Sequence, residues 1–430
     1  GLLLFLGNDE SGMNYADNTY HFRQDSTFLY FFGLPYAGLS AIIDIDNNRE
    51  IIFGDELTID AIVWMGTQPT LKEKSEAAGI TEVRPFKEID TYLKNAQQKG
   101  QPIHYLPTYR AEHQIKLFQW LGVVPGAEKP SVPFIMGVVN QRNYKSEEEI
   151  AEIEKACIVT ADMHLAAMRT VRPGIRESEV AAAVAEVALA NNYELSFPII
   201  ATINGQTLHN HDHSNLIKSG DMLLLDAGAE TEMGYAGDMS STIPADAKFT
   251  TRQREIYDIQ VAAHEAAVAA LRPGIPFVDV YELSCKVIME GLKELGFVKG
   301  DPMEAVRAGA HAMFMPCGLG HMMGLDVHDM ENLGEIWVGY DGKPKSTLFG
   351  RKSLRLAREL ECGFVHTIEP GIYFIPELID LWKGQKKFND FIHYDAVEAY
   401  KDFGGIRNEE DYLITETGAR RLGKKIPLTA

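Results

Sequence analysis

The chain has 430 residues, 45% hydrophobic and 24% charged, so it has ample apolar material for a folded core and is not an intrinsically disordered polymer. Asp and Glu outnumber Lys and Arg by 61 to 41, and this formal charge of minus 20 argues against nucleic acid as a partner, because phosphates would be repelled. The length suggests two or three domains. The negative net charge suggests an acidic surface or a bound cation.

The amino-terminal apolar run and the cysteines indicate the compartment. Leu2 to Leu6 is far shorter than the roughly 20 apolar residues that cross a bilayer, and no Lys or Arg precedes it as in a secretory signal. No CxxC spacing is present, which fits a reducing compartment and argues against a disulfide framework or a thiolate zinc site. We therefore expect a soluble, cytoplasmic protein with no membrane partner. The cysteines are Cys157, Cys285, Cys317 and Cys362.

The first third of the chain alternates short apolar runs with polar helical stretches. Strands are predicted over Phe28–Phe32, Ala41–Ile45 and Ile51–Phe53, separated by turn residues such as Gly33 and Pro35. This alternation is typical of an α/β domain.

A domain boundary is predicted near residue 145. Four prolines lie between Pro107 and Pro133, and Ser146 with Glu149 three positions later forms the capping-box pattern that opens a helix. We therefore expect an amino-terminal domain over residues 1–145 and a second domain over residues 146–430.

The second domain contains an apparent internal repeat. Arg-Pro-Gly-Ile follows an alanine-rich helical stretch at Arg172–Ile175 and again 100 positions later at Arg272–Ile275. This pattern predicts two similar helix–helix–strand halves related by an approximate two-fold axis. The alternative is that Pro-Gly is simply a common helix stop.

Two aspartates lie in a predicted hairpin. Asp226 follows four apolar residues in the predicted strand Met222–Gly228, Glu230–Gly234 makes the turn, and Asp238 lies in the partner strand Tyr235–Ile243. A carboxylate in an apolar strand is costly to bury unless it is paired or bound to a metal. The alternative for each aspartate alone is a turn cap.

Three further candidate ligands follow at long spacing. His321 lies in a Gly-rich apolar stretch, Glu369 ends an apolar strand before a turn, and Glu409 precedes the apolar run Tyr412–Ile414. Taken singly, such a histidine is more often a core residue, and Glu409 is more readily explained as part of a solvated acidic loop.

Together, four carboxylates and one imidazole suit two divalent cations. Four carboxylates and a bridging hydroxide carry five negative charges against four positive, whereas one cation would leave the cluster strongly anionic. Oxygen-rich ligation without thiolate favours Mn(II), and Zn(II), Co(II) and Fe(II) are also compatible.

These residues carry a family resemblance. The motifs Leu-Asp-Ala-Gly, Gly-Leu-Gly-His, Ile-Glu-Pro-Gly-Ile-Tyr and Arg-Asn-Glu-Glu-Asp, in this order, resemble the pita-bread (creatinase/aminopeptidase-like) metallopeptidases, in their aminopeptidase P and prolidase branch. Asn18–Phe32 resembles the amino-terminal domain of that branch, so the resemblance covers nearly the whole chain. It implies an α/β amino-terminal domain and an α+β pita-bread catalytic domain with pseudo-two-fold symmetry. It also implies a two-metal hydrolase that removes a residue preceding proline.

The resemblance also assigns roles to the candidate residues. Asp226 would bind one metal, His321 and Glu369 the other, and Asp238 and Glu409 would bridge, with Glu369 also moving the proton of the nucleophile. Four further residues complete the implied site. His209 and His328 would stabilise the tetrahedral intermediate or orient substrate, Arg355 would bind substrate, and Arg407 would hold the metal carboxylates. The neighbours of His209, His211 and His213, are expected to be solvated loop residues.

Three positions depart from the family pattern. The two aspartates are separated by one residue more than in the usual family hairpin, so the turn must absorb it, for example as a bulge. Relatives commonly carry His at Cys317 and Ile at Asn408. These changes affect the surroundings of the metal site and leave the five ligands in place.

Two substrate classes follow from the resemblance. Arg355 falls where prolidases carry an arginine that grips the free carboxylate of a dipeptide, which favours an Xaa-Pro dipeptidase. The alternative is an Xaa-Pro aminopeptidase acting on longer peptides. A non-catalytic pita-bread binding module or a metal-free, creatinase-like enzyme is disfavoured because all five ligands are present. The expected partners are small peptides with proline at the second position and further copies of the chain in a dimer or tetramer.

Overall fold

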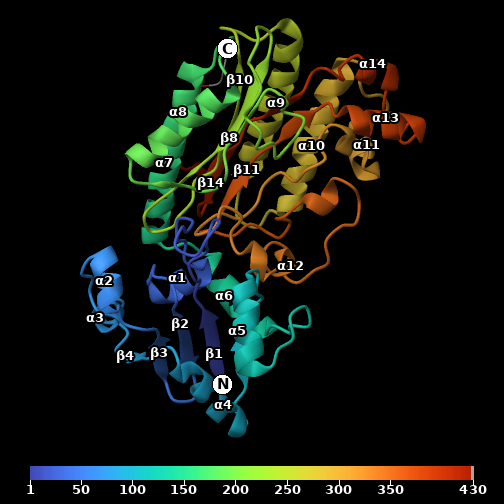
Figure 1. Cartoon of the computed structure of the whole chain (residues 1–430). Helices are drawn as coiled ribbons and strands as arrows, with labels where there is room; N and C mark the ends of the chain where they lie inside the picture. The colour runs from blue at the N-terminus through green and yellow to red at the C-terminus, as the bar shows by residue number, and fades with distance from the viewer. Residues whose placement is uncertain (428–430) are drawn as a thin grey trace. The chain divides into compact units, whose positions relative to one another are not determined.

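The computed structural model describes residues 1–427, which form two compact units (Figure 1). Unit 1 comprises Gly1–Gln141 with Asn332–Gly334, and unit 2 comprises Arg142–Glu331 and the described chain from Glu335 onward. All the predicted site residues belong to unit 2.

Unit 1 is built on a mixed five-stranded sheet with the strand order β4-β3-β2-β1-β5. The β1–β2 and β2–β3 pairs are antiparallel, whereas β1–β5 and β3–β4 are parallel. The strands are β1 (Leu2–Leu6), β2 (Ser40–Asp44), β3 (Arg49–Phe53), β4 (Glu82–Arg84) and β5 (Ile103–Tyr105). The predictions for Ala41–Ile45 and Ile51–Phe53 are therefore confirmed within one or two residues.

Side-chain alternation gives this sheet two apolar faces. Leu2 and Leu4 of β1 share a core with Leu93 and Leu117 from two helices, while Phe5 points to the opposite face and contacts aromatic rings there. The helices that begin in this unit are α1 (Ser26–Phe32), α2 (Ile59–Met65), α3 (Leu71–Ala77), α4 (Glu88–Gln98), α5 (Ala111–Leu121) and α6 (Val132–Arg142).

The predicted strand over Phe28–Phe32 is wrong, because this segment is the helix α1. The Asp25 side chain caps the helix by accepting a hydrogen bond from the Phe28 backbone N–H at 2.9 Å, and Gly33 ends it in the left-handed conformation. An apolar run of five residues does not distinguish a buried strand from a buried helix, and here the capping residues decide.

Unit 2 contains two pairs of packed helices, and each pair spans one copy of the Arg-Pro-Gly-Ile repeat. Helix α7 (Glu147–Thr170) begins at Ser146 with the predicted capping box and packs against α8 (Glu177–Ala190). Helix α9 (Thr251–Ala270) packs in the same way against α10 (Phe277–Glu294) (Figure 1). The predicted repetition of helix pairs is thus present in the fold. Within residues 1–427, every helix is too short or too polar to cross a membrane.

The shorter helical segments of this part of the chain follow α10. They are α11 (Pro302–Ala308), η1 (Ala310–Met313), η2 (Glu331–Leu333), α12 (Glu335–Val338), η3 (Arg351–Ser353), α13 (Pro376–Gly384) and α14 (Tyr394–Glu398).

Short strands form the sheets beside these helices. One sheet has the order β10-β8-β7 and another the order β11-β14-β15, and an antiparallel bridge between Ser240 and Glu409 connects them. The strands are β6 (Glu194–Leu195), β7 (Ile200–Thr202), β8 (Met222–Ala227), β9 (Ala229–Glu230), β10 (Met239–Pro244), β11 (Val365–Ile368), β12 (Gly371–Tyr373), β13 (Gly405–Arg407), β14 (Glu410–Ile414) and β15 (Ala419–Arg421).

The alternation along β8 separates a core face from a site face. Leu223, Leu225 and Ala227 join the apolar core that includes residues of α7 and α8. Because successive side chains point to opposite faces, Leu224 and Asp226 lie on the other face, where Leu224 contacts a second apolar cluster. The fold therefore places Asp226 on the side of the sheet that the helices leave open.

The hairpin absorbs its extra residue at the tip. Asp226 pairs with Ser240 and Glu230 with Ala236, so the same register holds on both sides of the aspartates, and no bulge lies between them. The additional residue belongs to the loop from Thr231 to Tyr235. The second strand also begins later than predicted, at Met239.

Candidate active site

The two aspartates lie on one face of the β8–β10 hairpin. Asp226 is opposite Ser240, and Asp238 directly precedes β10, two positions before Ser240, so both carboxylates point the same way. Asp226 is 8% exposed and Asp238 is 4% exposed. Their separation of twelve positions in the sequence becomes a diagonal cross-strand neighbourhood.

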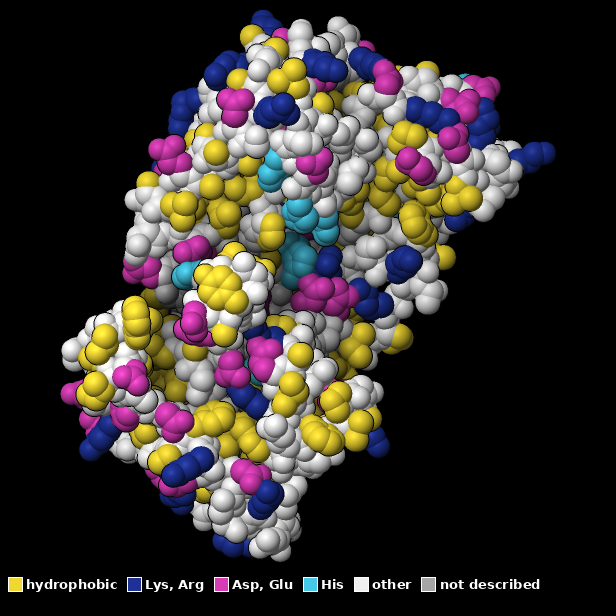
Figure 2. Space-filling model, viewed as in Figure 1, with side chains coloured by type: hydrophobic (Ala, Val, Ile, Leu, Met, Phe, Trp, Pro, Cys, Tyr) yellow, Lys and Arg dark blue, Asp and Glu magenta, His cyan; other side chains and the backbone are white. Residues whose placement is uncertain are grey.

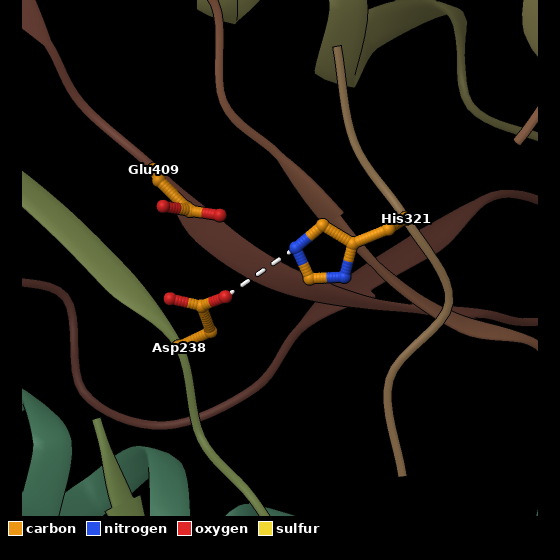
Figure 3. A group of neighbouring side chains, drawn as sticks. All are labelled: Asp238, His321 and Glu409. Atoms are coloured by element: carbon orange, nitrogen blue, oxygen red, sulfur yellow. Dashed lines mark ion pairs between the residues drawn. The ribbon is translucent and has the colours of Figure 1, made fainter. Parts of the chain in front are cut away.

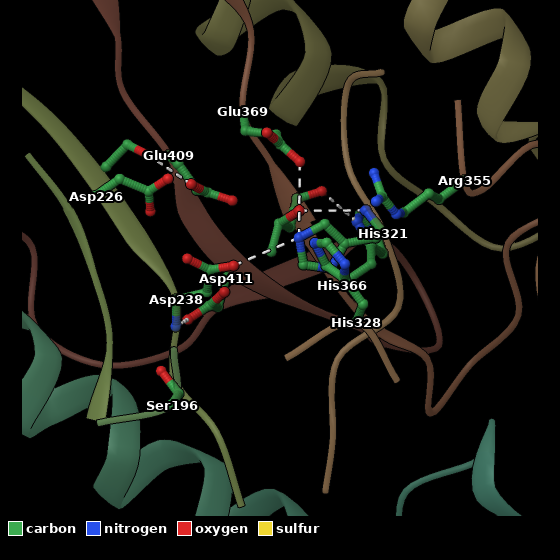
Figure 4. A network of polar contacts seen from close by, with 12 residues as sticks. Ser196, Asp226, Asp238, His321, His328, Arg355, His366, Glu369, Glu409 and Asp411 are labelled. Carbon is green, nitrogen blue, oxygen red and sulfur yellow. Dashed lines mark hydrogen bonds and ion pairs between the residues drawn. The ribbon is translucent and has the colours of Figure 1, made fainter. Parts of the chain in front are cut away.

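Three other segments bring the remaining predicted ligands to this place. His321 lies in the loop before the bridge at Met322, Glu369 directly follows β11, and Glu409 directly precedes β14. Asp238, His321 and Glu409 each offer a ligand atom within 4.8 Å of the others, and their side chains point toward one another (Figure 3). The His321 Nε2 atom is 3.4 Å from an Asp238 oxygen and 3.6 Å from a Glu369 oxygen (Figure 4).

All five side chains line one cavity of about 470 Å³. On the visible face of the molecule, histidine side chains gather in a hollow (Figure 2). The wall of the cavity also includes His209, His328, Arg355 and Arg407. The structure thus brings together all nine residues that the sequence predicted for the site.

Two carboxylate oxygens of the site are buried without a hydrogen bond from any residue of the stretch 1–427. The Oδ1 atoms of Asp226 and Asp238 have no hydrogen-bond partner among the described residues. Burial raises the pKa of Asp238 and of Glu409 well above the usual values, and the neighbouring carboxylates raise both further. Burial also raises the pKa of Glu369. Divalent cations would satisfy this set of oxygens and offset their mutual repulsion, so the residues fit a metal centre.

His321 is oriented as a metal ligand requires. Its Nδ1 atom lies 3.2 Å from the Met322 carbonyl oxygen, to which it donates when it carries the proton. This assignment leaves the Nε2 lone pair facing the carboxylates. Burial lowers the pKa of His321, which favours the neutral, metal-binding form.

Arg407 holds the carboxylates from within the protein. Its guanidinium donates to an Asp226 oxygen at 2.6 Å, to the Ser240 hydroxyl oxygen at 2.9 Å and to the Tyr373 hydroxyl oxygen at 2.9 Å. The Ser240 hydroxyl in turn donates to Glu409 at 2.7 Å. Asp226 and Glu409 are therefore held in one hydrogen-bonded network.

The two predicted catalytic histidines differ in their surroundings. The His328 Nδ1 atom is 2.6 Å from a Glu331 oxygen, and its ring lies edge-on to His321 with the centroids 4.2 Å apart. Burial lowers the pKa of His328 to about 4. His209 lies in the loop after β7 and is the more exposed of the two, and partial burial lowers its pKa as well.

Arg355 faces the cavity from the loop after η3. Its Nε atom lies 3.4 Å from carboxylate oxygens of both Glu331 and Glu335. Two carboxylates therefore hold the stem of the guanidinium at the cavity wall. His328 and Arg355 share Glu331 as a partner, so one acidic side chain orients both.

Three neighbouring positions complete the description. His211 is exposed but also lines the cavity, so it is closer to the site than expected. His213 is not simply a solvated loop residue, because its Nε2 atom lies 3.0 Å from the Ile199 carbonyl oxygen. Cys317 lines the cavity too, and burial raises the pKa of its thiol to about 12.

Sequence reasoning missed three residues that organise the site. They are Ser240, Glu331 and Tyr373, which support Glu409, His328 and Arg407 respectively. Ser240 carried a local signal, because it lies two positions after Asp238 and such side chains share a face in extended chain. Glu331 lies three positions after His328 on the same segment, whereas Tyr373 comes from a separate segment that only the fold brings close to Arg407.

Comparisons with known proteins agree with this geometry. Residues 151–416 match metallopeptidase family M24, and residues 1–104 match the amino-terminal domain of aminopeptidase P. The chain belongs to metallopeptidase family M24. Membership in M24 implies divalent metal ions at the site.

The curated M24 relatives include both expected types of peptidase. The chain is 32% identical to the Xaa-Pro aminopeptidase of Escherichia coli K12, over 95% of this chain and 87% of the relative. It is 27% identical to the Xaa-Pro dipeptidase of Homo sapiens, over 98% of this chain and 85% of the relative. The alignment with the dipeptidase thus extends over the amino-terminal domain as well.

Solved M24 structures confirm the predicted fold class. A variant of Escherichia coli aminopeptidase P in complex with substrate superimposes with a TM-score of 0.80 at 29% identity, covering 99% of this chain and 91% of that chain. Proline aminopeptidase P II from Yersinia pestis gives a TM-score of 0.81 at 28% identity, covering 99% of this chain and 92% of that chain. The chain therefore has an α/β amino-terminal domain and a pita-bread catalytic domain.

Proposed function

We propose that this M24 protein hydrolyses the peptide bond between an N-terminal residue and proline, and that it acts as an Xaa-Pro dipeptidase. The observation that carries the proposal is the convergence of His321, three buried carboxylates and the half-buried carboxylate of Glu369 on one cavity. The cavity also presents two further histidines and Arg355.

The five converging side chains are the proposed metal ligands. Asp226 would hold one ion, His321 and Glu369 the other, and Asp238 and Glu409 would bridge them. Bound divalent cations, for which we propose Mn(II), would provide a hydroxide nucleophile at neutral pH and polarise the scissile carbonyl. The unpartnered Oδ1 atoms of the two aspartates support a pair of ions at this position.

The remaining chemistry is proton transfer and positioning by the protein. Glu369 is less buried than Asp238 and Glu409 and lines the cavity, where its carboxylate would take a proton from the nucleophile and pass it to the leaving proline nitrogen. His209 and His328 lie on the cavity wall, where a ring N–H would donate to the oxygen of the tetrahedral intermediate.

Arg355 supports the dipeptide as the preferred substrate. A guanidinium recognises a carboxylate with strong, charge-assisted hydrogen bonds, and a dipeptide places its free carboxylate one residue from the scissile bond. Arg355 lines the same cavity as the proposed ligands and is held there by Glu331 and Glu335. Longer peptides would place an uncharged amide in this position.

An Xaa-Pro aminopeptidase is the second candidate. The match of residues 1–104 to the aminopeptidase P amino-terminal domain and the 32% identity to the Escherichia coli enzyme favour it. Hydrolysis of Ala-Pro and of Ala-Pro-Ala by the Mn(II)-loaded protein, measured side by side, separates the two. We expect faster release of alanine from Ala-Pro; preference for Ala-Pro-Ala would favour the aminopeptidase, and no cleavage of either would contradict the proposal.

We also propose the remaining features implied by the family resemblance. The chain would form a dimer or tetramer, which analytical ultracentrifugation tests directly. A domain boundary near residue 145 would separate the two domains, and limited proteolysis with mass analysis of the fragments tests it. The four free cysteines support a cytoplasmic location, which fractionation of the source cells tests.

A further inference from the structure

A fully buried glutamine lies next to the proposed metal site without facing the cavity. Gln260 is on α9, which packs against β11, β12 and β13, and its side chain has no solvent exposure. A buried carboxamide costs free energy unless its donors and acceptor are all paired. The partners of Gln260 therefore indicate why a polar residue is present in the middle of this helix.

Both donated hydrogen bonds go to backbone carbonyls next to proposed ligands. The Gln260 Nε2 atom donates to the Pro370 oxygen at 2.7 Å and to the Asn408 oxygen at 3.3 Å. Pro370 directly follows Glu369, and Asn408 directly precedes Glu409. One side chain thus joins the two separate chain segments that carry these glutamates.

Asn408 completes the arrangement through its own carboxamide. Its Nδ2 atom donates to the Gln260 Oε1 atom, and its Oδ1 atom accepts from the Thr242 backbone N–H at 3.3 Å. Thr242 belongs to β10, which begins directly after Asp238. The Gln260–Asn408 pair therefore links α9 to the segments that carry three of the five proposed ligands.

We propose that Gln260 is a positioning residue that fixes the separation of Glu369 and Glu409 and thereby sets the affinity of the metal centre. This inference rests on the proposed function, because it takes both glutamates as ligands. Residues that hold ligands in place without touching the metal commonly change metal affinity by about 10- to 100-fold. Gln260 acts from α9 through the backbone carbonyls next to the two glutamates, and Asn408 is its side-chain partner.

The test is titration of the chelator-stripped full chain with MnCl₂ by isothermal calorimetry, together with thermal unfolding. Gln260→Met keeps the length of the side chain and removes both donors, and we expect about tenfold weaker Mn(II) binding. Asn408→Leu removes one carboxamide and leaves the donors of Gln260 in place, and we expect about threefold weaker binding. The matched control is Ser284→Ala on α10, a buried hydroxyl that donates to the Ala263 oxygen instead of to a residue next to a proposed ligand.

The outcomes separate this inference from the proposed function. If the unaltered chain takes up no Mn(II), the proposed function itself is wrong. If it binds Mn(II) and Gln260→Met binds equally well, only the positioning role is overturned. A purely structural role would lower the melting temperature of Gln260→Met and Ser284→Ala alike without weakening Mn(II) binding in either. Should Gln260→Met fail to fold, unchanged affinity in Asn408→Leu would overturn the inference.

Discussion

Unit 2 contains two kinds of buried carboxylate site, an ion pair around Asp329 and the cluster with Asp238 and Glu409, and their pKa values shift in opposite directions. Asp329 is 3% exposed and pairs with Arg142 at 2.6 Å and Lys145 at 2.9 Å. Asp238 and Glu409 are equally buried, but carboxylates are among their main electrostatic neighbours. Burial disfavours the charge of Asp329, yet the two cations outweigh it and lower its pKa, whereas the pKa of Asp238 and of Glu409 is raised.

The comparison shows that burial alone does not distinguish a functional site. The Asp329 group carries its own counterions and is complete within the fold. The Asp238 group has unpartnered oxygens and excess negative charge, so it requires cations from solution. The identity of the charge partners therefore separates a structural ion pair from a candidate metal site.

The largest effect is expected when the charge of one proposed metal ligand is removed. Glu409→Gln keeps the shape of the side chain and should reduce Ala-Pro hydrolysis by more than about 100-fold, the upper range for residues that merely support a ligand. In chelator-stripped protein the same variant should be at least as stable as the unaltered chain, because a repelled carboxylate is lost. Activity assays and melting curves with and without Mn(II) measure both effects. Full activity with Mn(II) supplied would contradict the ligand assignment.

Removal of the carboxylate charge of Asp329 should instead destabilise the fold. Asp329→Asn removes the buried negative charge that Arg142 and Lys145 share, and we expect a loss of about 3 kcal/mol in the free energy of unfolding. The chelator-stripped protein isolates this effect in urea denaturation. A loss below 1 kcal/mol, within the usual range for a surface pair, would remove the distinction between the two groups.

Asp411 tests the comparison through the pH dependence of the free energy of unfolding. Burial raises the pKa of Asp411 to about 7, although the Cys157 thiol and the Asp238 backbone N–H donate to it. Between about pH 4, its ordinary pKa, and 7, the folded state holds a proton that the unfolded state has lost, so this contribution to stability falls as the pH rises. In the chelator-stripped unaltered chain, Asp411 should make the free energy of unfolding fall by up to about 1.4 kcal/mol per pH unit in this range. Chelator-stripped Asp411→Asn should lack this contribution. Identical slopes in the two proteins would show that Asp411 is not perturbed in this way.

Arg355 gives the smallest expected effect and tests the substrate side of the site. Arg355→Ala should raise the KM for Ala-Pro about tenfold, because a charge-assisted contact with the substrate carboxylate is lost, and should change Ala-Pro-Ala cleavage less. Arg254→Ala, an exposed arginine on α9 that pairs with Asp258, is the matched control. Equal effects on the two substrates would remove the reason to prefer a dipeptidase.

Local signals accounted for much of the fold. The capping box at Ser146, the apolar strand ending near Asp226 and the repeated Arg-Pro-Gly-Ile segments all lie where the structure has the corresponding elements. The segment Phe28–Phe32 was assigned wrongly because its apolar run has no period, and the capping residues Asp25 and Gly33 select the helix.

The sequence by itself determined the kinds of chemical groups and their order. These are four carboxylates and an imidazole in motifs that identify the family, and some of the carboxylates lie in or beside apolar strands. Tertiary structure alone decided which atoms meet. Glu331 reaches the distant Arg355, and Gln260 joins the segments of Glu369 and Glu409, because helix and strand packing brings distant segments within hydrogen-bonding distance. Such contacts depend on angstrom-scale positions set by the whole core, and no local pattern of residues encodes them.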